Sequence, residues 1–216
     1  MDKPAKLVIS FSLVGIAILY TLSVVVNPPL VPLDEVALHE GTVIRTRGVL
    51  TAFSLTESGN VVMKIEGNGT ELLIFVNSKV AGSKEVLNLS YGDELELEGT
   101  VEVYRGEYEL VVSENAIKKL TSGSTISFVA QIAMDPEAYK GRKIQVAGYV
   151  EEIYQRVFYL RDETGTYHLR VKLADTHMPP ISGLQEGALI IAEGVLAYDA
   201  RTMRYELNLV AWKHAA

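Results

Sequence analysis

The chain of 216 residues contains no cysteine, one tryptophan and only four histidines. Without cysteine it can form neither a disulfide nor a thiolate zinc site, and it has no thiol nucleophile. The four histidines are scattered, with no spacing typical of metal ligands. The chain also lacks the Gly-x-Ser-x-Gly, His-Glu-x-x-His and Walker patterns of common enzyme classes. These absences predict a protein that is not an enzyme and that needs no cofactor or metal.

Basic residues are also scarce, because 20 Lys and Arg oppose 27 Asp and Glu, for a net charge of −7. The deficit lies mainly in residues 27–120, which hold 8 basic and 15 acidic residues, whereas residues 121–216 hold 10 and 11. Binding to duplex nucleic acid needs many Lys and Arg contacts to phosphates. The composition therefore argues against non-specific duplex binding and assigns any nucleic-acid role mainly to the second half of the chain.

One long hydrophobic run is present near the amino terminus. Residues 7–26 contain no charged side chain, and a helix of that length spans about 30 Å, the thickness of a bilayer core. Lys3 and Lys6 precede the run and no basic residue follows it before Arg45, so the positive-inside rule predicts a cytoplasmic amino terminus. We expect residues 1–29 to form a single-pass anchor in the cell membrane, with the rest of the chain extracytoplasmic. A cleaved signal peptide is the alternative, and it would export the same residues.

Two glycine-bounded patterns occur twice in the chain, in the same order and at similar spacing. Residues 41–48 are matched by residues 141–148, and residues 92–99 by residues 187–194. Such an internal repeat indicates two copies of one structural unit. It predicts two domains, at 34–120 and 125–216.

Alternating apolar residues predict five strands in each copy. These are expected near 42–53, 60–66, 71–77, 93–104 and 107–113, and again near 142–154, 156–162, 166–174, 188–198 and 203–211. Between the copies we expect a linker at 121–124 and a short helix over 125–139, interrupted near Pro136. Five strands with a break between the third and fourth are typical of an OB-fold barrel. The predicted class is therefore all-β: two tandem five-stranded OB-fold barrels behind an N-terminal transmembrane helix.

The second copy also resembles known OB-folds in sequence. Residues 135–141, followed by alternating Ile144, Val146 and Val150, are similar to the entry of the first strand in many OB domains. Residues 158–165 resemble the second-strand pattern of the anticodon-binding OB-fold family, which occurs in class II aminoacyl-tRNA synthetases. The resemblance covers about 90 residues. It implies nucleic-acid binding, with Phe158 or Tyr159 in the place of an aromatic residue that stacks on a base.

Strand alternation in the second copy predicts a candidate binding face. If Phe158 and Leu160 face the core, the opposite face carries Tyr159, Arg161, His168, Arg170 and Lys172. The hairpin loops beside this face add Arg156, Tyr198, Arg201, Arg204 and Tyr205. Cations interleaved with aromatic rings suit single-stranded nucleic acid, because the charges follow the backbone and the rings stack on bases. We therefore predict single-stranded DNA or RNA as the ligand of these residues.

Other interpretations remain open. An ordinary solvated strand face carries the same residue types, and export together with the acidic first copy favours a protein-binding or scaffold module that assembles with envelope proteins. A third interpretation comes from the overall plan, an anchor followed by an exported OB barrel with His214 after the last strand. This plan resembles the haem chaperone of cytochrome c maturation, although the chain lacks that family's tyrosine-bearing tail and has two barrels instead of one.

Overall fold

The computed structural model describes residues 8–9, 11–18, 20, 27–121, 125–173 and 183–215. Residues 1–30 and residues 31–216 form separate compact units. Residues 8–9, 11–18 and 20 are helical. In the ranges just given, no helix combines the length and the apolar character needed to cross a membrane. The predicted anchor falls partly outside the described residues and stays a prediction.

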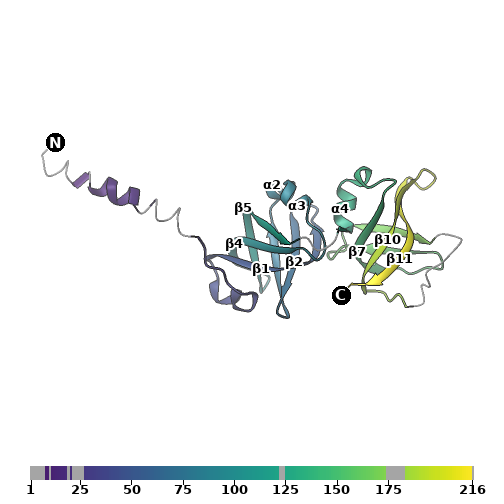
Figure 1. Cartoon of the computed structure of the whole chain (residues 1–216), viewed down its shortest axis with the longest axis horizontal. Coiled ribbons are helices and arrows are strands. Elements are labelled where there is room, and N and C mark those ends of the chain that lie inside the picture. Colours follow the sequence, from purple (N-terminus) through teal and green to yellow (C-terminus); the bar gives the residue numbers. More distant parts are fainter. Residues whose placement is uncertain are drawn as a thin grey trace. The chain divides into compact units, whose positions relative to one another are not determined.

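A closed five-stranded barrel follows the short 3-10 helix η1 (Leu33–His39). Its strands are β1 (Val43–Leu55), β2 (Val61–Gly67), β3 (Thr70–Val76), β4 (Glu94–Tyr104) and β5 (Glu107–Thr121) (Figure 1). They pair in the order β1-β2-β3-β5-β4, and β4 pairs with β1 to close the ring. The short helices α2 (Ser78–Ala81) and α3 (Lys84–Leu87) connect β3 to β4. This order fits the OB-fold, so a predicted five-stranded barrel is confirmed.

The barrel core comes from alternate apolar residues of its strands. Leu50, Met63 and Ile74 are fully buried on three successive strands. Their neighbours in sequence point outward, because side chains alternate between the two faces of a strand. The strand predictions are confirmed to within a few residues, except that β5 continues eight residues beyond the predicted end at 113.

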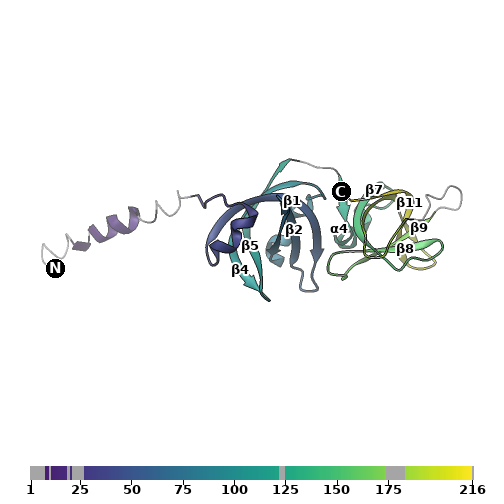
Figure 2. The same cartoon turned by 90° about the horizontal axis from the view of Figure 1, so that it is seen from below.

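The second part of the chain forms a six-stranded sheet. Its strands are β6 (Ile126–Phe128), β7 (Lys143–Glu151), β8 (Val157–Arg161), β9 (His168–Leu173), β10 (Leu189–Asp199) and β11 (Arg204–His214). The sheet order is β10-β11-β9-β8-β7-β6, and β10 also pairs with β7. Five strands therefore follow one another in a closed ring, which Figure 2 shows around β7, β8, β9 and β11. This ring has the same cyclic order as the first barrel.

The helical prediction over 125–139 is partly wrong. Residues 126–128 form strand β6, because they pair in parallel with residues 145–147 of β7. Helix α4 (Val129–Met134) and the 3-10 helix η2 (Pro136–Ala138) follow, and they are separated at Asp135 as predicted. The predicted linker residues 122–124 lie outside the described residues.

The repeated glycines occupy equivalent positions in the two rings. Gly92 and Gly187 have φ of +85° and +81°, a conformation that side chains rarely allow. Gly99 and Gly194 lie where a neighbouring strand comes very close. A Cβ atom at either position would lie 2.4 Å from a carbonyl oxygen, that of Val111 or that of Asn208. Each pair of glycines is thus required by the same backbone geometry.

Side chains also connect the barrel to the second sheet within residues 31–216. The Phe128 ring stacks on the Phe53 ring with centroids 5.7 Å apart. Lys64 Nζ lies 2.7 Å from Glu163 Oε1. Gln131, only 5% exposed, donates hydrogen bonds to main-chain carbonyl groups of the first barrel. These contacts hold the two parts together as one compact unit, and the predicted division at 34–120 and 125–216 stays a prediction.

Candidate nucleic-acid interface

One cleft brings together five of the residues predicted to bind nucleic acid. It has a volume of about 450 Å³ and is lined by Tyr159, His168, Arg170, Arg204 and Tyr205. The remaining lining residues are mostly apolar and come from α4, β9 and the start of η2: Val129, Ile132, Ala133, Pro136 and Leu169. The cleft therefore combines an apolar lining with aromatic and cationic side chains, and we call it the tyrosine cleft.

Strand register places the central residues of the tyrosine cleft side by side. Tyr159 of β8 lies opposite Arg170 of β9, and Arg170 lies opposite Glu206 of β11. The adjacent residues Leu160 and Val171 are fully buried. The predicted alternation, with apolar residues inside and Tyr159 and Arg170 outside, is confirmed at these positions.

The charge of Arg170 is neutralised within the chain. Its guanidinium forms a hydrogen-bonded ion pair with Glu206, whose side chain is only 4% exposed. A buried carboxylate needs such a partner, because an unpaired buried charge is costly. The sequence interpretation missed Glu206 because the parallel pairing of β9 with β11 joins residues 36 positions apart.

Arg161 has a local structural role. Its Nη1 donates to the carbonyl oxygens of Asp162 and Glu163, at 3.0 and 3.2 Å, and its guanidinium carbon lies 5.1 Å from the centre of the Tyr149 ring. Asp162, which is 4% exposed, accepts hydrogen bonds from the Tyr167 backbone and the Thr164 hydroxyl. Together they build the β8–β9 turn, so Arg161 is not a lining residue of the tyrosine cleft.

His168 is also paired, because its Nε2 lies 2.8 Å from Glu151 Oε2. The two predicted tyrosines of the last hairpin lie side by side, with the Tyr198 and Tyr205 ring centroids 5.2 Å apart. The Tyr205 hydroxyl donates to Glu137 of η2. This hydrogen bond is the main reason why the pKa of Tyr205 is raised to about 12. It also holds the pKa of the Glu137 carboxyl below its usual value.

The remaining predicted cations lie on the surface. Arg204, Arg201 and Lys172 are exposed, and so is Arg156 in the β7–β8 connection. Of these, only Arg204 lines the tyrosine cleft. Across the described ranges, no cluster of three or more His, Asp or Glu side chains could hold a metal ion.

No protein-family model matches the chain, and no curated protein sequence matches it either. Among solved structures, it is similar to asparaginyl-tRNA synthetase from Pyrococcus horikoshii, at 17% identity and a TM-score of 0.39, over 50% of this chain and 26% of the synthetase. It is also similar to the telomere capping protein Ten1 from Saccharomyces pombe, at 16% identity and a TM-score of 0.33, over 43% of this chain and 82% of Ten1. The chain spans about a quarter of the length of the synthetases that it matches.

Proposed function

We propose that this chain is a non-catalytic binding protein that takes single-stranded nucleic acid into the tyrosine cleft. The observation that carries the proposal is the composition of that cleft. An apolar lining beside Tyr159 and Tyr205 suits a base, because stacking on aromatic rings is how such proteins hold bases without sequence preference. The exposed guanidinium of Arg204 suits the adjacent phosphate.

The predicted cations are expected to contribute unequally to phosphate binding. Arg204 is exposed and lines the cleft, whereas Arg170 is held by Glu206. Each cation that neutralises a phosphate releases counterions and steepens the salt dependence of binding. We therefore expect Arg204→Ala to reduce the salt dependence more than Arg170→Ala does.

The second sheet supports the proposal through its topology. We propose that it is a second OB-fold barrel, because its ring has the strand order of the first barrel and its glycines meet the same backbone constraints. On this basis the chain contains two barrels in tandem, and only the second carries the cations and tyrosines of the cleft.

Titration of the full chain with labelled single-stranded oligonucleotides at two salt concentrations tests the function. Binding should weaken steeply as salt rises, and Tyr159→Ala should cost about 1–3 kcal/mol of binding free energy if its ring stacks on a base. Lys79→Ala is a matched control, because Lys79 is exposed on α2 of the first barrel. An absence of binding at low salt would contradict the proposal.

A protein-binding role in envelope assembly is the second candidate, and one observation favours it. The β4–β5 hairpin of the first barrel exposes the apolar side chains of Val103, Tyr104 and Tyr108, at 45%, 53% and 38%. Exposed aromatic groups of this kind are enriched where proteins bind one another. Loss of a captured envelope protein on Tyr104→Ala, in a chain that binds no oligonucleotide, would favour this candidate.

We also propose that residues 7–26 anchor the chain in a membrane with its amino terminus in the cytoplasm. The proposal rests on the uncharged run and on Lys3 and Lys6. Alkaline extraction of membranes should leave the full chain in the pellet, and protease added outside intact spheroplasts should digest the barrels. Release of the chain by alkali would show that no anchor is present.

A further inference from the structure

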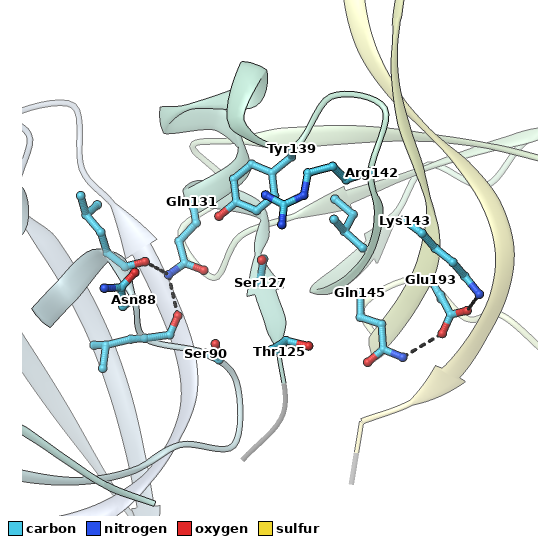
Figure 3. Close-up of a pocket in the computed structure, with 13 residues that line it drawn as sticks. Asn88, Ser90, Thr125, Ser127, Gln131, Tyr139, Arg142, Lys143, Gln145 and Glu193 are labelled. Atoms are coloured by element: carbon cyan, nitrogen blue, oxygen red, sulfur yellow. Dashed lines mark hydrogen bonds and ion pairs between the residues drawn. The ribbon is translucent and has the colours of Figure 1, made fainter. Parts of the chain in front are cut away.

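A second groove lies where the second sheet meets the first barrel, within residues 31–216. It has a volume of about 670 Å³. The first barrel contributes residues 87–90 just before β4, and the second part contributes β6, the η2–β7 turn and β10. Figure 3 shows Asn88 and Ser90 on one side of it, and Lys143, Gln145 and Glu193 on the other. We call it the junction groove.

Several hydrogen-bond acceptors that line the junction groove already have donors within the chain. Glu193 receives Lys143 Nζ at 2.5 Å on one carboxylate oxygen and Gln145 Nε2 at 2.8 Å on the other. Gln131 Oε1 accepts from the Phe128 backbone at 2.9 Å. The carbonyl oxygens of Leu87 and Leu89 accept from Gln131 Nε2 at 3.3 and 2.8 Å.

The donors are in a different situation. The Arg142 guanidinium carries five N–H groups, and among the described residues it gives one hydrogen bond, to the Ala138 carbonyl at 3.1 Å. The hydroxyls of Ser90, Thr125 and Ser127 also line the groove, and no hydrogen bond among the described residues engages them. Figure 3 draws Arg142, Ser127 and Thr125 among the residues that line the groove. The groove therefore offers a ligand guanidinium N–H groups and hydroxyls that can donate.

The net charge of the residues that line the groove is positive, which also favours an anionic ligand. Arg142 and Lys143 outnumber the single carboxylate of Glu193 among the lining residues, although the whole chain has a net charge of −7. Lys143 is paired with Glu193, so the excess charge is that of Arg142, which suits a negatively charged ligand rich in acceptors. A phosphate group meets both conditions, since its oxygens accept several hydrogen bonds and pair with a guanidinium through two of them.

We propose that the junction groove binds a phosphate ester, with Arg142 as the main contact and the Ser127 and Thr125 hydroxyls as additional donors. The phosphate could come from a small phosphomonoester or from the backbone of a nucleic-acid strand. The site does not depend on the tyrosine cleft, because the two share no lining residue.

Isothermal titration of the full chain at low salt tests the proposal, with glucose 6-phosphate and a single-stranded oligonucleotide as separate probes. Arg142→Ala should weaken binding of at least one probe about tenfold or more, because a charge-assisted hydrogen bond is lost. Ser127→Ala should weaken the same probe about threefold, because a neutral hydrogen bond contributes less. Lys79→Ala, which removes an exposed charge on α2, should leave both affinities unchanged.

The source of the phosphate follows from which probe responds. An effect on glucose 6-phosphate, with no binding of glucose itself, identifies a small phosphomonoester. An effect on the oligonucleotide alone identifies the strand backbone. Tyr159→Ala separates this site from the tyrosine cleft, because it should weaken the oligonucleotide and leave glucose 6-phosphate unchanged. Thermal melting checks that the Arg142→Ala and Ser127→Ala variants are folded. The proposal is overturned if both folded variants bind both probes as tightly as the wild type does, or if glucose binds as tightly as glucose 6-phosphate.

Discussion

Replacing Gly99 or Gly194 by alanine tests whether the two rings are built on the same close strand contact. In each case the new Cβ atom would lie 2.4 Å from a main-chain carbonyl oxygen, and such contacts essentially never fall below 3.0 Å. The obstacle is a neighbouring strand rather than a flexible side chain. The strands of the ring must therefore move apart, which lengthens hydrogen bonds on both sides of the substitution.

The expected cost follows from the size of this displacement. Overpacking that forces backbone shifts costs typically about 1–3 kcal/mol, and a rigid closed ring places the effect near the upper end of that range. For a unit of this length, each 1 kcal/mol lowers the melting temperature by about 2–4 °C. We therefore expect each substitution to lower it by about 5–10 °C.

Thermal melting followed by circular dichroism measures the effect, with Gly82→Ala as the control. Gly82 has φ of −83°, and a Cβ atom there would meet nothing within 4 Å. This control should be neutral or slightly stabilising. Because residues 31–216 form one compact unit, Gly99→Ala and Gly194→Ala should lower a single shared transition. An unchanged melting temperature in either variant would refute the close contact, and two separate transitions would show that the barrels unfold independently.

Two further predictions concern ionised side chains. Lys64→Met removes the partner of Glu163 and should lower stability by about 1 kcal/mol. Burial raises the pKa of the Glu163 carboxyl, but hydrogen bonds from Lys64 and Tyr149 outweigh this effect and lower the pKa below 4.5. The difference in melting temperature between wild type and variant should therefore persist at neutral pH and disappear as the pH falls through that lowered pKa. Glu137→Gln should return the pKa of Tyr205 from about 12 toward 10.0, which ultraviolet titration of tyrosine ionisation measures, and an unchanged titration curve would exclude the hydrogen bond as the cause.

Much of the barrel architecture could be predicted from local pattern alone. Alternating apolar residues predicted ten strands, and glycine-bounded patterns that recur at similar spacing predicted two copies of one unit. Strand β6 escaped prediction, because three residues beside a helix carry no periodic signal. Residues 126–128 are a strand only because residues 145–147 lie alongside them.

The ion-pair partners of the charged residues in the tyrosine cleft could not be predicted from local pattern. Alternation correctly placed Arg170 on the outer face, but its charge is matched by Glu206 through a parallel pairing of distant strands. Outside the cleft, Glu163 likewise contacts Lys64, a residue 99 positions away. Local pattern predicts which face a residue occupies, whereas its partners depend on how distant strands are paired.

The Arg161–Asp162 pair shows why a family resemblance can predict a fold and still leave the function open. Both residues belong to residues 158–165, which resemble the second-strand pattern of anticodon-binding OB-folds, yet in this chain they organise the β8–β9 turn. Arg161 donates to two carbonyl groups of that turn, and Asp162 accepts from its backbone and from Thr164. Their role in the turn accounts for both residues whether or not the chain binds nucleic acid. The functional proposal therefore depends on Tyr159 and Arg204, which line the tyrosine cleft and are not required by the turn.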